Sequence, residues 1–214
     1  MTGAGQAAEQ RALWSAAPRD WAEIAEPQNE PLFAAVLDAA AVGAGTRLLD
    51  VACGSGYAAR MAARRGARVA GVDVTPELLA IARERVPDGD LREADMAALP
   101  FADGAFDVVT GFNAFAFAAD PPAAIAEAAR VLAPGGRLAV AGFAEPEHNE
   151  GTVLHLAMKA LVAEAEPDGY APYSLSDPGA LEAALREAGL APAGEREVAL
   201  DWSYPDEQTA LRAL

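Results

Sequence analysis

Residues 48–56 read Leu48-Leu49-Asp50-Val51-Ala52-Cys53-Gly54-Ser55-Gly56, an apolar run that ends in an acidic residue and then two glycines. The run is typical of a buried strand, and apolar residues then recur at helical spacing until Gly66. Glycine is needed where a ligand approaches the backbone without meeting a Cβ, and a helix N-terminus leaves N–H groups free. The stretch therefore predicts a strand, a ligand-binding turn and a helix.

Strand and helix signals alternate on both sides of this stretch. A helix from Pro31 to Gly43 precedes the first strand, and Thr75-Pro76 and Asp120-Pro121 each begin a later helix. The expected strands are 47–51, 68–73, 90–94, 106–112 and 137–143. Strands joined by helices imply right-handed crossovers and a parallel sheet covered on both faces. The expected fold class is α/β, a Rossmann-like, doubly wound and mostly parallel sheet.

The remaining segments are less regular. An inserted helix is expected at 152–165 and a further helix from Ser176 to Gly189. Alternation over 195–202 predicts a sixth strand, and a last helix begins at Asp206. Near the N-terminus, Trp14 and Trp21 are seven residues apart, a spacing that predicts one helical face.

Charge and composition narrow the class of partner. The 214 residues carry a formal net charge of −16, which repels phosphate, so we expect no nucleic acid and no anionic membrane as partner, but a small molecule. The longest uncharged stretch, 108–119, is shorter than the roughly 20 apolar residues of a membrane helix. We find no secretory signal in residues 1–12, and the single cysteine cannot form an internal disulfide. A cytoplasmic location is therefore expected.

Two cofactor classes suit the glycine turn. With Ala59, the turn satisfies the dinucleotide pattern G-x-G-x-x-G/A, and Asp73 ends the second strand where a ribose-binding acid belongs. Asp50, however, would lie near a pyrophosphate, which costs electrostatic energy, whereas the same carboxylate favours a ligand with an ammonium and a sulfonium. Asp95-Met96 supplies an acceptor for an adenine amino group and a thioether for the adenine face.

On these residues the chain resembles the class I S-adenosylmethionine-dependent methyltransferases, of the broad type-11 group that includes ubiquinone and menaquinone biosynthesis methyltransferases. The resemblance covers roughly residues 30–200 and includes 101–109 and 129–138, similar to the family's approaches to its fourth and fifth strands. It implies S-adenosylmethionine as cofactor and S-adenosylhomocysteine as product, with backbone contacts at Ala52 and Gly54, a ribose acid at Asp73 and an adenine acid at Asp95. The implied cofactor-binding residues are Asp50, Ala52, Cys53, Gly54, Ser55, Gly56, Asp73, Val74, Asp95, Met96, Phe112 and Asn113.

The resemblance also implies a domain plan. Residues 1–43 form N-terminal helices, 44–144 the cofactor-binding core, 145–175 a substrate-side insertion and 176–214 the C-terminal part of a single domain. This N-terminal part is interpreted either as a lid over the cofactor or as a helix that packs on the core through its two tryptophans. The family adds a final antiparallel strand beside the fifth; here the chain is either truncated or lacks that strand, and we expect truncation.

Several residues have two interpretations. Residues 110–117 lack the D/N-P-P-Y/F motif of amino-methylating nucleic-acid enzymes, and Phe112, Phe115 and Phe117 either line a substrate pocket or pack at the sheet edge, the interpretation we favour. Asn113 is expected near the methionine portion of the cofactor. Cys53 is interpreted as packing beside the turn rather than as a nucleophile. His148 and His155 fall in the expected insertion and are assigned no role.

The leading hypothesis is a methyltransferase that transfers a methyl group to a small-molecule acceptor by in-line displacement. Alignment and exclusion of water supply much of the rate of such a transfer, so we assign no catalytic residue, and we expect no metal. The alternatives are an NAD(P)-dependent oxidoreductase and a non-catalytic S-adenosylmethionine-binding protein. Acceptor identity, the atom methylated and the oligomeric state stay open.

Overall fold

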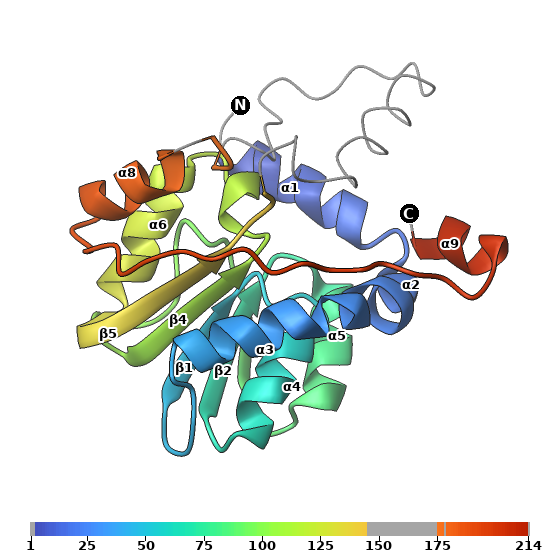
Figure 1. The fold of residues 1–214 in the computed structure, drawn as a ribbon, viewed down its shortest axis with the longest axis horizontal. Helices are drawn as coiled ribbons and strands as arrows, with labels where there is room; N and C mark the ends of the chain where they lie inside the picture. The colour runs from blue at the N-terminus through green and yellow to red at the C-terminus, as the bar shows by residue number, and fades with distance from the viewer. Residues whose placement is uncertain (1–2, 145–174, 178, 214) are drawn as a thin grey trace.

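A computed structural model of the chain describes residues 3–144, 175–177 and 179–213 (Figure 1). The expected helix at 152–165, both histidines and nearly all of the expected insertion lie outside the described residues. Within the described ranges, no helix is long and apolar enough to cross a membrane.

The centre of the molecule is a five-stranded parallel sheet in the order β3-β2-β1-β4-β5. Its strands are β1 (Arg47–Val51), β2 (Arg68–Asp73), β3 (Asp90–Glu93), β4 (Phe106–Phe112) and β5 (Leu132–Ala141). The predicted α/β fold and parallel sheet are confirmed, and β1, β2 and β4 have the predicted bounds. β5 begins earlier than predicted, because Leu132 already pairs with Phe106 before the chain bulges and Arg137 pairs with Val108.

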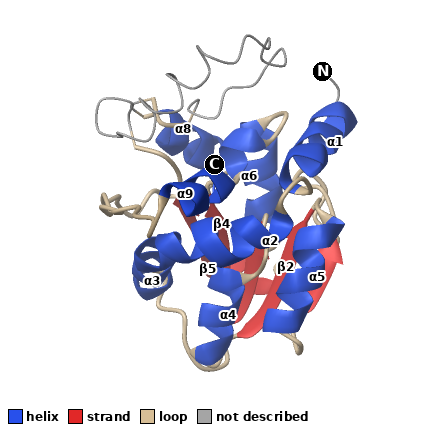
Figure 2. Cartoon of the chain, turned by 90° about the vertical axis from the view of Figure 1, so that its right-hand side faces the viewer, coloured by secondary structure: helices blue, strands red, loops and turns tan. Residues whose placement is uncertain are grey.

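Helices cover both faces of the sheet (Figure 2). α3 (Glu30–Ala39), α4 (Tyr57–Arg64) and α5 (Pro76–Arg85) pack on one face, where they share a core with Leu48. α6 (Pro121–Arg130) and α8 (Ala180–Glu187) pack on the other face against Leu49. The two leucines lie on opposite faces because successive side chains of a strand alternate.

Most of the residues predicted to start a helix do so in the structure. Asp120 accepts a hydrogen bond from the N–H of Ala123 at 3.1 Å and so caps α6, and α5 begins directly after Thr75. α8 begins at Ala180 rather than at Ser176, after Gly179 in a left-handed conformation.

The N-terminal segment, defined here as residues 3–29, runs along the carboxyl edge of the sheet (Figure 1). It consists of α1 (Gly3–Trp14), α2 (Pro18–Asp20), the π-helical turn η1 (Trp21–Ala25) and the 3-10 turn η2 (Glu26–Asn29). The prediction that Trp14 and Trp21 share one helical face is wrong, because the helix ends at Trp14 and a new one starts at Pro18. Their rings nevertheless pack edge to face, with the ring centroids 4.9 Å apart.

The predicted sixth strand at 195–202 is also wrong. The segment pairs with no strand among the residues that the structure describes, and its side chains are mostly exposed, so the alternation does not define a buried face. It runs beside α3 in an extended path (Figure 1), where Arg196 donates to the carbonyl oxygen of Ala35 at 2.7 Å and the N–H of Ser203 donates to Gln28 at 2.7 Å. It leads into α9 (Glu207–Ala213), whose Arg212 pairs with Asp20 of the N-terminal segment.

Candidate functional site

The turn between β1 and α4 lies where the strand order reverses. β2 and β3 continue the sheet on one side of β1, while β4 and β5 lie on the other. Ala52, Gly54 and Gly56 all have positive φ, of 55°, 54° and 78°. A parallel sheet opens a ligand-binding crevice at the carboxyl ends of its strands at such a point. The glycine turn is therefore located where the sequence analysis expects a cofactor.

Asp73 at the end of β2 joins the turn to the sheet. Its Oδ2 accepts a hydrogen bond from the N–H of Gly54 at 2.9 Å, and its Oδ1 accepts one from the N–H of Thr75 at 2.8 Å. Burial raises the pKa of Asp73, against the effect of these N–H donors. Since each carboxylate oxygen has two lone pairs, each retains acceptor capacity for a hydroxyl group.

Asp50 is buried inside the sheet rather than displayed in the turn. The hydroxyl of Thr110, its neighbour on β4, donates to Asp50 Oδ1 at 2.8 Å. Burial raises the pKa of Asp50 to about 7; the Thr110 bond opposes that rise, and repulsion from Glu26 and Asp73 adds to it. A cation bound near the turn would favour the ionised form of this carboxyl group.

Cys53 and Gly56 have clear packing roles. A Cβ at Gly71 would lie 2.9 Å from Cys53 Sγ, so the thiol lies against β2, and burial raises its pKa well above the usual value. This supports packing for Cys53, since a thiol of raised pKa is a poor nucleophile. A Cβ at Gly56 would lie 2.9 Å from the Cβ of Ala82, so this glycine allows α4 and α5 to approach closely.

Three of the predicted cofactor-binding residues lie together. Val74, Asp95 and Met96 line one partly open hollow, which is also lined by residues 117–119 and by Gln6, Ala7 and Gln10 of α1. Asp95 Oδ1 accepts from the N–H of Ala97 at 2.9 Å, which orients the carboxylate. The N-terminal helix thus covers the place at which the sequence analysis expects the adenine ring.

The phenylalanines after β4 differ in their surroundings. Phe112 packs edge to face on Phe33 of α3 at 4.8 Å, and Phe115 is fully buried against Gly111. Phe117, in contrast, lines the hollow beside Met96. Asn113 is held at the sheet edge with φ of 49°, and its N–H donates to the carbonyl oxygen of Ala141 at 2.8 Å. Phe112 and Phe115 support the packing interpretation.

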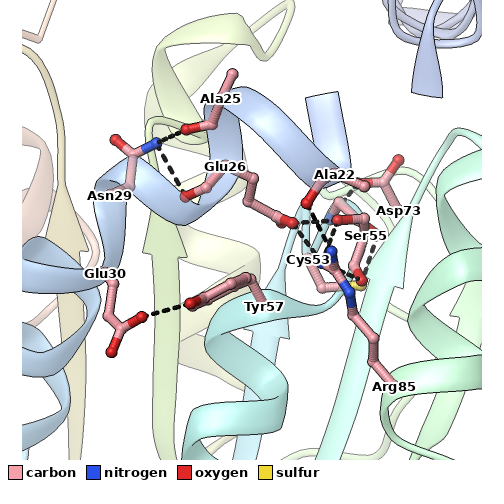
Figure 3. Close-up of polar contacts among 11 residues, drawn as sticks. Ala22, Ala25, Glu26, Asn29, Glu30, Cys53, Ser55, Tyr57, Asp73 and Arg85 are labelled. Carbon is pink, nitrogen blue, oxygen red and sulfur yellow. Dashed lines mark hydrogen bonds and ion pairs between the residues drawn. The ribbon is translucent and has the colours of Figure 1, made fainter. Parts of the chain in front are cut away.

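The structure also places at the turn a cluster that sequence reasoning did not identify, defined here as the Glu26 cluster: Glu26, Ser55 and Arg85 (Figure 3). Arg85 Nη1 donates to Glu26 Oε2 and to Ser55 Oγ, both at 2.6 Å, and the Ser55 hydroxyl donates to the same carboxylate oxygen. Arg85 Nη2 donates to the carbonyl oxygen of Ala22 at 2.6 Å. No motif marks Glu26, which is far from the glycines in sequence.

The Glu26 cluster bears on which cofactor the turn can take. Burial raises the pKa of Glu26; hydrogen bonds from Ser55 and Arg85, the Arg85 charge and a backbone hydrogen bond from Tyr57 oppose the rise. Tyr57 is the first residue of α4, so the carboxylate lies at the helix N-terminus. A dinucleotide pyrophosphate would need that same position, and two anionic groups there repel each other. This geometry disfavours a dinucleotide.

Comparison with known proteins agrees with the geometry. A family model described as a methyltransferase domain matches residues 49–140. An uncharacterized protein of Mycobacterium tuberculosis is 43% identical over 138 residues, which are 63% of this chain and 50% of the relative. The demethylmenaquinone methyltransferase of Thermus thermophilus is 47% identical over 116 residues, 51% of this chain and 53% of the relative. The chain spans about half the length of these curated relatives.

A solved structure extends the likeness to the fold. The crystal structure of a putative methyltransferase from Bacillus halodurans has a TM-score of 0.57 and 25% identity, and the alignment covers 73% of this chain and 68% of that one. Residues 49–140, which the family model matches, include most of β1, the glycine turn, β2, β3 and β4. The sheet, the glycine turn and these matches together support assignment of residues 49–140 to the methyltransferase-domain family, and over this range the chain is similar to class I S-adenosylmethionine-dependent methyltransferases.

Proposed function

We propose that this chain transfers a methyl group from S-adenosylmethionine to a small-molecule acceptor. The observation that carries the proposal is the arrangement at the carboxyl edge, where the ends of β1, β2 and β3 bring together the glycine turn, Asp73 and Asp95-Met96. These positions correspond to the methionine, ribose and adenine portions of the cofactor.

The residues present fit that cofactor. Asp73 retains acceptor capacity on both oxygens for two ribose hydroxyls, while Asp95 accepts from the adenine amino group between Val74 and Met96. Ala52 and Gly54 contribute through their backbone, as do Cys53, Ser55 and Gly56, whose own side-chain positions face the protein. Phe112 and Asn113, at the end of β4, bound the proposed site on that side. Buried carboxylates around the turn suit a ligand with two positive groups.

In this proposal the chain aligns the reacting groups and excludes water from them. When bound, S-adenosylmethionine supplies a methyl group on a sulfonium that is already activated for transfer. The turn and Asp73 hold the reactive region in one orientation, and α1 shields the hollow from water. The transfer requires an acceptor aligned in line with the methyl group, and no residue need act as a base.

Three observations support a small-molecule acceptor. The net charge of −16 disfavours nucleic acid, and residues 110–117 lack the D/N-P-P-Y/F motif. The name of the Thermus thermophilus relative states a small-molecule acceptor, demethylmenaquinone. A cytoplasmic location goes with this proposal.

Calorimetric titration with S-adenosylmethionine, S-adenosylhomocysteine and NADH tests the cofactor. We expect the first two ligands to bind and NADH not to bind. Asp73→Ala removes two charge-assisted hydrogen bonds to the ribose, so the dissociation constant should rise about 100-fold. Asp103→Ala is the matched control, because that side chain is 82% exposed and lies far from the turn in the fold.

The outcomes separate the alternatives. Binding of NADH alone would refute the proposal and favour an oxidoreductase. Cofactor binding without methyl transfer to any of a broad panel of quinones, phenols and amines would favour the non-catalytic alternative. Transfer to one class of acceptor would confirm the activity and identify the atom that is methylated.

A further inference from the structure

Two side chains of the N-terminal segment lie directly over the glycine turn. A Cβ built on Gly54 would lie 3.4 Å from Glu26 Oε1 and 3.6 Å from Trp21 Nε1. The two groups therefore face the same backbone position, which the proposed function assigns to the methionine portion of the cofactor. One group is a hydrogen-bond acceptor with a negative charge, and the other is a donor.

The Glu26 carboxylate is held so that one oxygen stays next to the turn. Its Oε2 is the oxygen bound by Arg85 and by Ser55 (Figure 3). Its Oε1 is the oxygen beside Gly54. Glu26 is only 4% exposed, so it does not reorient freely in water. Arg85 also binds the carbonyl oxygen of Ala22 and is therefore a positioning residue, which joins α5 to the N-terminal segment.

The indole N–H of Trp21 has no hydrogen-bond acceptor within the part of the chain that the structure describes. Trp14, whose ring packs on Trp21, differs in this respect, because its Nε1 donates to Gln10 Oε1 at 3.1 Å. An indole N–H that is partly buried normally finds a partner. At Trp21 this donor atom instead lies beside the glycine turn, 3.6 Å from the Cβ position of Gly54.

We propose that Glu26 and Trp21 bind the amino-acid end of the cofactor: Glu26 accepts from the α-ammonium, and the Trp21 N–H donates to the α-carboxylate. This inference rests on the proposed function and assigns two further residues to the same site. A neighbouring acceptor and donor match the two groups of an amino acid, and the pairing of a carboxylate with an ammonium is a charge-assisted hydrogen bond. The N-terminal segment is then part of the binding site as well as its cover.

A pair of ligands isolates this end of the cofactor. S-adenosylhomocysteine carries the ammonium and the carboxylate, whereas 5′-methylthioadenosine has the same adenosine and thioether but lacks both groups. Calorimetry would give the dissociation constants of both ligands for the wild type, Glu26→Gln, Trp21→Phe and Asp73→Ala. Glu30→Gln is the matched control, because Glu30 lies in the next helical turn and its carboxylate is bound to the Tyr57 hydroxyl.

We expect selective effects. Glu26→Gln should weaken S-adenosylhomocysteine about 10-fold or more and Trp21→Phe about 5-fold, the range for a lost hydrogen bond, while binding of 5′-methylthioadenosine stays within about 2-fold. Asp73→Ala should weaken both ligands, since both contain the ribose. Glu30→Gln should weaken neither.

Other outcomes overturn the inference. Equal weakening of both ligands by Glu26→Gln and Trp21→Phe would show that these side chains only shape the turn. Unchanged binding of S-adenosylhomocysteine would show that they do not contact the ligand. Thermal melting of each variant checks the fold. If Glu26→Gln unfolds, Trp21→Phe, which keeps an aromatic ring at that position, still tests the inference. Failure of the wild type to bind either ligand would instead refute the proposed function.

Discussion

The sheet and the N-terminal segment meet at the same edge of the molecule but are held in place by different interactions. β1, β2 and β4 begin and end where the apolar pattern predicts, and their side chains are buried on both faces. The N-terminal segment changes from α-helix to π-helical and 3-10 turns within residues 3–29. Contacts with distant residues hold it: Arg85 with Glu26, Glu93 with Arg11 and Arg212 with Asp20.

This difference separates two tasks of the site. The glycine turn and the acids at the strand ends are built by local backbone geometry, which hydrophobic periodicity specifies. The side chains that cover the turn are placed by pairing between segments far apart in sequence. We therefore expect substitutions in the two regions to act differently. Those in the sheet and its turn should affect the stability of the sheet, and those in the N-terminal segment should affect its attachment to the sheet.

The largest effect is expected where the two regions are joined. Arg85→Met removes the guanidinium from the buried Glu26 carboxylate, which should lower the free energy of unfolding by about 4 kcal/mol. Arg19→Met is the control, because Arg19 is 66% exposed and its nearest acid, Glu23, lies at 3.7 Å; the cost there should be below about 0.5 kcal/mol. Urea denaturation followed by tryptophan fluorescence measures both, and equal losses would contradict the comparison.

Two glycines with similar φ, Gly56 in the turn and Gly45 before β1, distinguish backbone strain from close packing. Gly45 has φ of 81° and open space around it, while Gly56 has φ of 78° and lies against Ala82. Gly45→Ala should cost about 1 kcal/mol for the left-handed conformation. Gly56→Ala should cost about 3 kcal/mol, because overpacking between α4 and α5 is added. Chemical denaturation gives both values; similar losses would mean that α4 and α5 can separate without cost.

A smaller effect is expected from the proton on Asp50, which lies in the sheet but is repelled by Glu26 of the segment. Its pKa of about 7 is above the unfolded value of 3.8, so the folded state binds more protons between these pH values. The resulting stability is fully present below about pH 4 and is lost as the pH rises through about 7. Between pH 5 and pH 8 this group alone should lower the free energy of unfolding by about 2.5 kcal/mol.

Asp50→Asn tests this pH dependence. The variant keeps a side chain that can pair with Thr110 but does not titrate, so its stability should fall less between pH 5 and pH 8 than that of the wild type. Thermal or urea unfolding at the two pH values measures the difference. The same pH dependence in both proteins would show that Asp50 does not have a folded-state pKa near 7.

Much of the site could be predicted from the sequence because it depends on strand ends. A residue at the carboxyl end of a parallel strand is brought to the common edge by the fold class itself. That argument places Asp73, Asp95 and Met96 near the turn, and the structure brings all of them to that edge. The glycine pattern also predicts a turn at Gly54 and Gly56, but not that Gly56 is required by the contact with Ala82.

Two of the errors come from reliance on periodicity along the chain. Residues 195–202 alternate, but they run beside α3 as an exposed extended segment instead of pairing with a strand. Trp14 and Trp21 have helical spacing, but the helix ends at the first of them and the rings meet through a turn. In both cases tertiary contacts override the local signal.

The sequence by itself determined the parallel sheet, the glycine turn after β1 and the acids that line the carboxyl edge, because strand burial and left-handed glycines are local properties of the chain. Only the tertiary structure decided which side chains cover that turn. Glu26 and Trp21 reach Gly54 through the ion pair with Arg85 and the packing of Trp14, and no spacing along the chain encodes these contacts.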